Sequence, residues 1–224
     1  FKTIIQAIHE GRGIFDNIQK VMLYLLSDSL SQIMLIVGTI LMGLPVALTA
    51  TQILWINIIT DSLPALALTF EPHDLSRARN FPRSQSTLLS FPIMLFMLCT
   101  SFIIGLVGLL LYMRFLNVTS IEVARTVTFS YFALSTLFII FPVRTLLQPI
   151  WKVPLFNNPI LILVIALGVL MQLFVIQLSS LQFLINTASL LFSEWIYIIA
   201  AVAIVCILVE LLKVIMRLFK LDVR

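Results

Sequence analysis

Charged side chains are scarce in this sequence. Only 11% of its 224 residues are Asp, Glu, Lys or Arg, whereas 61% are hydrophobic. Ordinary globular domains carry about 25% charged residues. The composition therefore excludes a water-soluble globular domain and predicts a multi-pass integral membrane protein, in the cell membrane if the source is bacterial. The lipid bilayer is its expected surrounding, and no nucleic acid is expected as a partner.

Cysteine and histidine are nearly absent, with two of each. Cys99 and Cys206 lie in apolar runs without the spacing of a metal site or a disulfide pair, so we interpret both as small hydrophobic side chains. His9 and His73 lie in segments with basic residues, and we interpret them as solvated surface residues. Neither pair points to a soft transition metal.

An initiating Met, a cleavable signal peptide and a Gly-rich phosphate loop are also missing. The chain opens in mid-pattern with FKTIIQAIHEGRGIFDNIQK, and we expect it to be a fragment of a longer protein. No nucleophile constellation is found either, so no catalytic residue is expected within the chain itself.

Long apolar stretches are what the sequence has in abundance. Crossing a bilayer as a helix takes about 20 apolar residues. The stretches that qualify are 20–42, 51–70, 91–114, 124–143, 159–177 and 193–213. No segment alternates apolar and polar residues with a period of two, so strands are not expected. The sequence predicts an all-α membrane protein with six transmembrane helices.

The basic residues are distributed unevenly between the two sides of this predicted membrane domain. Twelve of the 14 Lys and Arg residues fall on one side, and only Arg114 and Arg125 fall on the other. By the positive-inside rule both termini are cytoplasmic. The uncharged segment 178–192 is expected at the outer interface, although it could also extend the fifth span.

The second span carries the most informative cluster. In the run ILWINIITDSLPALAL, Asn57, Thr60 and Asp61 have the i, i+3 and i+4 spacing that places side chains on one face of a helix. Pro64 has no backbone N–H, so the carbonyl of Thr60 is expected to be free. A carboxylate at membrane depth usually marks an ion or substrate pathway. The alternative is an interhelical hydrogen bond that holds two spans together; we favour an ion site because the proline opens the backbone beside the acid.

The first span offers further polar side chains, namely Asp28, Ser29 and Gln32. A connection of roughly eight residues makes the first two spans antiparallel neighbours. At about 1.5 Å rise per residue, Ser29 and Gln32 reach the depth of the Asn57, Thr60 and Asp61 cluster. Asp28 is expected either to line a cytoplasmic access route or to bond to another helix. An all-oxygen ligand set suits a hard cation such as Ca²⁺, Mg²⁺ or Na⁺.

Two stretches carry a resemblance to a known family. EGRGIFDNIQKVMLYLLSDS and GLPVALTATQILWINIITDSLPALALTFEPHD resemble the carboxy-terminal membrane half of P-type cation ATPases. The most similar branch is the calcium pumps of the sarcoplasmic-reticulum and secretory-pathway kind. Beyond residue 90 the resemblance rests on the six-span topology and on loop spacing.

The resemblance implies how the chain is divided. Residues 1–19 would be the cytoplasmic link from the phosphorylation domain into the first span, and 20–70 the ion-binding helix pair. Residues 71–90 would form a cytoplasmic connection that packs under the phosphorylation domain. Residues 91–224 would form a four-helix membrane support domain with a basic tail.

The resemblance also implies a set of metal ligands. In the family, the helix matching the second span supplies an Asn, a Thr and an Asp, which are Asn57, Thr60 and Asp61 here. The helix matching the first span supplies an Asn and a Glu, where this chain has Ser29 and Gln32. Pumps that carry two calcium ions use a further acid in the helix matching the fourth span, where the nearest aligned residue is Thr136. The loss of these acids favours one divalent ion per cycle, with Ca²⁺ as the expected cargo.

The expected partners are the remaining parts of the same polypeptide: the actuator, nucleotide-binding and phosphorylation domains and the first four helices. ATP and Mg²⁺ would bind only to these upstream domains, and the chain as given is not expected to hydrolyse ATP. Two other functions stay open. The six helices could form a passive channel or secondary carrier, or they could be the scaffold of a pseudo-pump that transports nothing.

Overall fold

The computed structural model describes residues 2–72, 89–146, 148–150 and 155–219, and this part of the chain is helical without strands. The helices that are long and apolar enough to cross a membrane, among the described residues, are Gly13–Leu41, Ala50–Thr69, Phe91–Leu116, Ile121–Arg144, Pro159–Gln177 and Phe192–Leu218. These six helices match the stretches selected from the sequence. The prediction of an all-α membrane protein with six spanning helices is confirmed.

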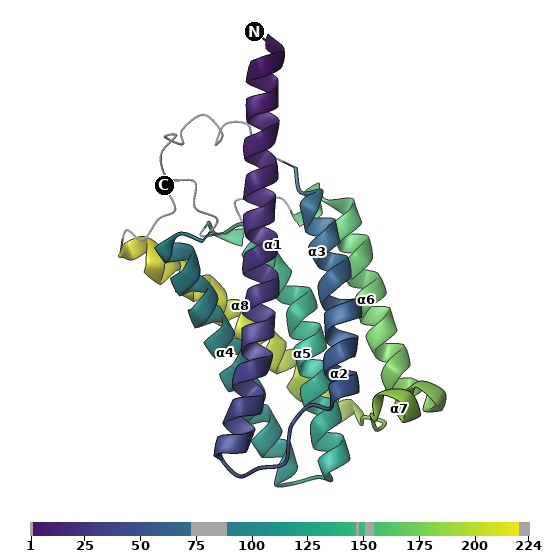
Figure 1. The fold of residues 1–224 in the computed structure, drawn as a ribbon. Coiled ribbons are helices and arrows are strands. Elements are labelled where there is room, and N and C mark those ends of the chain that lie inside the picture. Colours follow the sequence, from purple (N-terminus) through teal and green to yellow (C-terminus); the bar gives the residue numbers. More distant parts are fainter. Residues whose placement is uncertain (1, 73–88, 147, 151–154, 220–224) are drawn as a thin grey trace.

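The first helix, α1 (Lys2–Leu41), runs without a break from the expected cytoplasmic link through the membrane. In Figure 1 it projects beyond the other helices, and it begins at the end of the bundle where the last helix, α8 (Phe192–Leu218), ends. An even number of crossings requires this arrangement. Gly43 follows α1 with a φ of 66°, which glycine adopts without steric cost, and Leu44 N–H donates to the Thr39 carbonyl at 2.9 Å. This Schellman-type stop turns the chain back.

The second crossing consists of α2 (Ala50–Trp55), a π-helical turn η1 (Ile56–Asp61) and α3 (Ser62–Thr69) in direct succession. A capping box begins α2: Gln52 N–H donates to Thr49 Oγ1 at 3.3 Å, and Thr49 N–H donates to Gln52 Oε1 at 3.0 Å. The π-helical turn contains all three residues of the predicted cluster. Such turns are rare and often occur at functional sites.

The central helix is α5 (Ile121–Arg144), with α4 (Phe91–Leu116), α6 (Pro159–Gln177) and α8 packed around it. Within an 18-residue apolar stretch of this helix, 89% of the residues are buried inside the protein. The hydroxyls of Thr126, Thr128 and Ser130 bond to carbonyls of the preceding turn, as Thr128 does to Ala124 at 2.8 Å. This local bonding satisfies polar groups that have no water to bind.

Small residues allow α4 to approach its neighbours closely. A Cβ added to Gly105 would lie 3.1 Å from the backbone oxygen of Ser31 in α1. A Cβ added to Gly108 would lie 2.5 Å from the ring of Phe132 in α5. Without a hydrophobic driving force between helices in lipid, close packing of this kind is what holds them together.

The segment after α6 does not continue the fifth span. Leu178 is extended, and the short helix α7 (Ser179–Ile185) begins there and ends at Asn186, which has a φ of 55°. Figure 1 shows α7 bent away from the axis of α6. Of the two possibilities for residues 178–192, the structure therefore excludes a longer fifth helix. A 3-10 turn, η3 (Leu155–Asn157), precedes α6.

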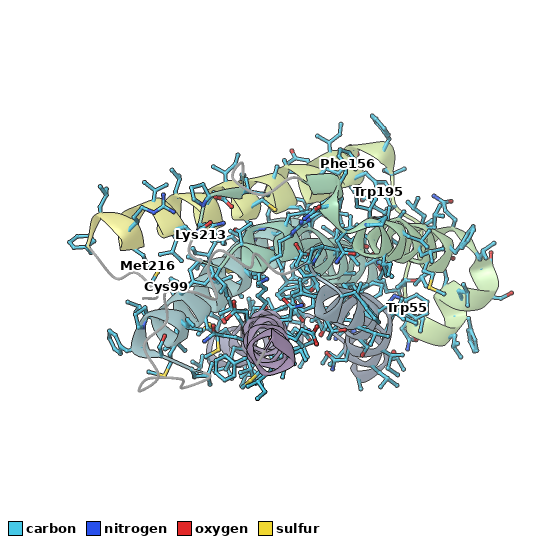
Figure 2. The ribbon with its side chains drawn as sticks, turned by 90° about the horizontal axis from the view of Figure 1, so that it is seen from above. Trp55, Cys99, Phe156, Trp195, Lys213 and Met216 are labelled. Carbon is cyan, nitrogen blue, oxygen red and sulfur yellow. The ribbon has the colours of Figure 1, made fainter. Side chains whose placement is uncertain are left out.

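Viewed along the bundle, α1 and the second crossing lie at the edge opposite α8 (Figure 2). Lys213, labelled in this view, extends from α8 into the protein, where its Nζ donates to the carbonyl oxygens of Pro142 and Gln148 at 3.0 and 2.9 Å. Its side chain is 1% exposed. This buried cation ties α8 to the end of α5.

Candidate cation site

Asp61 lies inside the protein. The residue is 4% exposed, and its Oδ1 atom is buried without a hydrogen-bond partner among the described atoms. Neither Arg nor Lys forms an ion pair with it in the described part of the chain. An unsatisfied oxygen of a buried acid costs free energy unless something binds it. Asp61 is therefore neither turned to lipid nor neutralised by a basic side chain.

A second acid lies near Asp61. Asp28 of α1 is buried like Asp61. Tyr24, one turn before Asp28 on the same face of α1, donates its hydroxyl to the carbonyl of Thr60, the residue before Asp61, at 2.9 Å. Asp28 is 1% exposed, and its two oxygens accept hydrogen bonds from Thr136 Oγ1 of α5 and Gln32 Nε2 of α1. The sequence left open whether Asp28 lines an access route or bonds to another helix, and the structure shows the bond to α5.

Thr60 lies next to Asp61, and both its hydroxyl and its carbonyl form hydrogen bonds within the protein. Its hydroxyl donates to the Ile56 carbonyl at 3.0 Å. Its carbonyl accepts a hydrogen bond from the hydroxyl of Tyr24 at 2.9 Å. The expectation of a free Thr60 carbonyl is therefore wrong, because a phenol from α1 binds the acceptor beside Pro64. A carbonyl oxygen has two lone pairs, so this bond leaves one of them.

The predicted ligands do not all face the acids. Gln32 is buried and bonded to Asp28, but Asn57 and Ser29 are exposed in this chain. The shared face of Asn57, Thr60 and Asp61 was derived for a regular α-helix. The π-helical turn Ile56–Asp61 closes its backbone hydrogen bonds five residues apart instead of four, so its side chains are rotated relative to those of a regular α-helix.

Two contacts of the site were missed from the sequence. Tyr24 is four residues before Asp28 and therefore lies on the same face of α1, which is a signal that could have identified it. Thr136 was named only through the family resemblance, and its bond to Asp28 joins residues 108 positions apart. No local pattern encodes that bond.

The donor set around Asp61 fits a hard cation. Carboxylate, hydroxyl and amide oxygens are the ligands that Ca²⁺ and Mg²⁺ prefer. Two carboxyl groups facing each other in a medium of low dielectric constant cannot both be ionised unless a cation compensates them. The described residues contain no group of three or more His, Cys, Asp and Glu side chains that could hold a metal ion. A complete shell of about six to eight oxygens for Ca²⁺ therefore needs further ligands.

A separate polar cluster lies at the end of the second crossing. Arg144 Nη2 of α5 is 2.8 Å from Glu71 Oε1, and both side chains are buried. Asn158 Nδ2 donates to Glu71 Oε2 at 3.0 Å and Asn17 Nδ2 to the Glu71 carbonyl at 3.0 Å. This cluster joins four helices at Glu71.

The expected contact of residues 71–90 with a phosphorylation domain is largely outside the described residues. His73, Arg77 and Arg79 belong to the part of the connection that the structure does not describe. Residues 71, 72, 89 and 90 of the connection are described, and the Glu71 side chain is directed into the chain itself.

Comparison with known proteins identifies the family. Residues 45–215 match the family model described as "Cation transporting ATPase, C-terminus". The chain belongs to this family, and the resemblance to the carboxy-terminal membrane region of P-type cation ATPases is confirmed.

Curated relatives match almost the whole chain. Calcium-transporting ATPase type 2C member 1 of Homo sapiens is 33% identical over 219 residues, which cover 97% of this chain and 24% of that protein. Calcium-transporting ATPase 1 of Bacillus cereus is 28% identical over 230 residues, covering 95% of this chain and 26% of that protein. The chain thus spans about a quarter of the length of the curated relatives it matches.

Proposed function

We propose that this chain is the ion-translocating carboxy-terminal part of an ATP-driven calcium pump. The observation that carries the proposal is the buried Asp61, whose Oδ1 is unpartnered and which has no basic counter-ion among the described residues. The names of the curated relatives, which are calcium-transporting ATPases, support Ca²⁺ as the cargo.

The proposed ligands are Asp61, Thr60, Asn57, Gln32 and Ser29. Asp61 and Gln32 are buried at the acid pair, whereas Asn57 and Ser29 open to the outside of this chain. The relatives are about four times as long, so helices contributed by the upstream part of the polypeptide would cover this surface and complete the oxygen shell. Of the acids that the family pattern has in these helices, this chain keeps only Asp61, and the loss of the others favours a single Ca²⁺ per cycle.

The long first helix supports a route by which ATP hydrolysis reaches the ion. Because α1 is one continuous helix of 40 residues, a movement at its exposed start displaces Asp28 and Gln32 at membrane depth. Phosphorylation upstream would then favour one of two arrangements with different access to Asp61. ATP and Mg²⁺ would bind to the upstream actuator, nucleotide-binding and phosphorylation domains.

A passive channel or secondary carrier is the second candidate, and a pseudo-pump scaffold the third. Family membership favours a pump over the former. The unpartnered oxygen of Asp61 favours ion binding over the latter, because a purely structural acid would be satisfied by its neighbours.

The test measures ATP hydrolysis by the full-length protein across Ca²⁺, Mn²⁺, Mg²⁺, Na⁺ and K⁺. We expect Ca²⁺ to stimulate hydrolysis and Asp61→Asn to abolish the stimulation. Glu122→Gln is the matched acid-to-amide control, because Glu122 is exposed in the first turn of α5. Stimulation at normal affinity in Asp61→Asn would show that Asp61 is not a ligand, and stimulation by none of the ions would exclude a pump.

A further inference from the structure

Asp28 has no counterpart in the ligand pattern that the family resemblance supplies. In that pattern an Asn stands at the position of Ser29 and a Glu at the position of Gln32, which are one and four residues after Asp28. Yet Asp28 is 1% exposed whereas Ser29 is exposed. Tyr24, one turn earlier on the face of α1 that carries Asp28, bonds to the carbonyl of Thr60 beside Asp61, so Asp28 and not Ser29 is directed to the side of α1 where Asp61 lies. Asp61 itself is 4% exposed, and its Oδ1 is buried without a hydrogen-bond partner among the described atoms.

We propose that Asp28 is a direct ligand of the transported ion and supplies the second carboxylate of its site. In the family pattern, acids stand at the positions of Gln32 and Thr136. The carboxylate of Asp28 replaces their negative charge, so that one divalent cation between Asp28 and Asp61 is neutralised by two carboxylates. This proposal rests on the proposed function and specifies its ligand set and its preference for a divalent ion.

The hydrogen bonds around Asp28 are those of a positioned ligand. Thr136 donates to one of its oxygens and Gln32 to the other, so the carboxyl group is held in place from two helices. Hydrogen bonds of this kind fix metal-binding carboxylates, and losing them typically lowers metal affinity by about 10-fold to 100-fold. Thr136 and Gln32 are therefore positioning residues of the site, and α5 takes part in it through Thr136.

The charge of this site explains a preference for divalent over monovalent cations. A site with two carboxylates is neutral when it holds a divalent ion and keeps a net negative charge when it holds Na⁺ or K⁺. Buried net charge in a medium of low dielectric constant is costly. The site therefore discriminates against monovalent ions by charge rather than by size.

The alternative is structural: Asp28 could carry a proton and only hold α1 against η1. The two roles differ in what Asp28→Asn does. An amide has nearly the same shape and can still hydrogen-bond with Thr136 and Asp61, so a structural role survives the change. A ligand role does not, because the site loses one of its two negative charges.

The experiment measures equilibrium binding of radiolabelled Ca²⁺ to the full-length pump. We expect Asp28→Asn to weaken binding at least about 10-fold and Asp61→Asn to abolish it, with Glu122→Gln unchanged. Combining Asp28→Asn with Gln32→Glu returns a carboxylate to a side chain that contacts position 28, and we expect it to restore most of the affinity.

Wild-type affinity in Asp28→Asn, with binding lost in Asp61→Asn, would overturn the role of Asp28 and leave the proposed function intact. Wild-type affinity in Asp61→Asn would instead overturn the proposed function. If Asp28→Asn does not fold, competition on the wild-type protein decides the matter. Displacement of Ca²⁺ by Mn²⁺, but not by a large excess of Na⁺ or K⁺, supports two carboxylates, and displacement by Na⁺ overturns them.

Discussion

Arg144 and Glu71 form a buried ion pair, with Nη2 2.8 Å from Oε1 and side chains that are 1% and 4% exposed. The pair links the end of α5 to Glu71, two residues after the end of α3. Asn158, the N-cap residue of α6, and Asn17 of α1 bond to the same Glu71. The end of the second crossing is thus held from three sides, about three turns of helix beyond Asp61.

Removing one member of this pair should destabilise the protein. Glu71→Gln keeps the shape of the side chain but removes the carboxylate that the buried Arg144 guanidinium binds, at a cost of about 3 kcal/mol. We expect a lower thermal unfolding midpoint of the full-length protein. Replacing both residues together, as in Glu71→Met with Arg144→Met, should recover part of the loss. A single variant as stable as the wild type would contradict the role given to the pair.

Tyr24→Phe should also lower stability, by a smaller amount. The change removes the hydroxyl that donates to the Thr60 carbonyl and leaves a buried acceptor unpaired, which costs about 1–3 kcal/mol. Tyr197→Phe is the control, because Tyr197 is 49% exposed and its ring, which the change keeps, packs edge-on against the ring of Phe115. Equal unfolding midpoints for the two variants would argue against a stabilising bond at Thr60.

Gly108→Ala tests the contact between α4 and α5. The new methyl group would lie 2.5 Å from a ring carbon of Phe132 and 3.0 Å from Tyr131, and both rings are fully buried. Overpacking of this kind costs about 1–3 kcal/mol. Gly11→Ala provides the comparison in a helix, since nothing lies within 4 Å of its added Cβ. We expect Gly11→Ala to be neutral or stabilising, so a larger loss there than at Gly108 would refute the packing explanation.

Asn57→Ala tests a proposed ligand that the chain leaves exposed. If upstream helices enclose the ion at this surface, losing the amide oxygen should weaken Ca²⁺ binding by the full-length protein about 10-fold. Ile58→Ala is the control at the neighbouring position, because the Ile58 side chain is 53% exposed and has no polar atom. An unchanged calcium affinity in Asn57→Ala would remove Asn57 from the ligand set and leave the acid pair unaffected.

The sequence predicted the spans well because each depends on local composition. An apolar run of sufficient length leaves the backbone no alternative to a helix in lipid. The same reasoning ended the first stretch at residue 42, next to the last residue of α1, Leu41. It could not show that Leu178 ends α6, because the segment 178–192 is uncharged and apolar enough to fit either possibility.

By itself, the sequence determined that six helices cross the membrane and that acids lie at membrane depth in the first two. Only the tertiary structure decided which side chains meet. The π-helical turn rotates Asn57 away from Asp61, α1 turns Asp28 inward and Ser29 outward, and Thr136 reaches Asp28 across 108 positions of chain. Spacing along one regular helix fixes neighbours on that helix alone, whereas a contact between helices depends on how each is rotated and packed against the others.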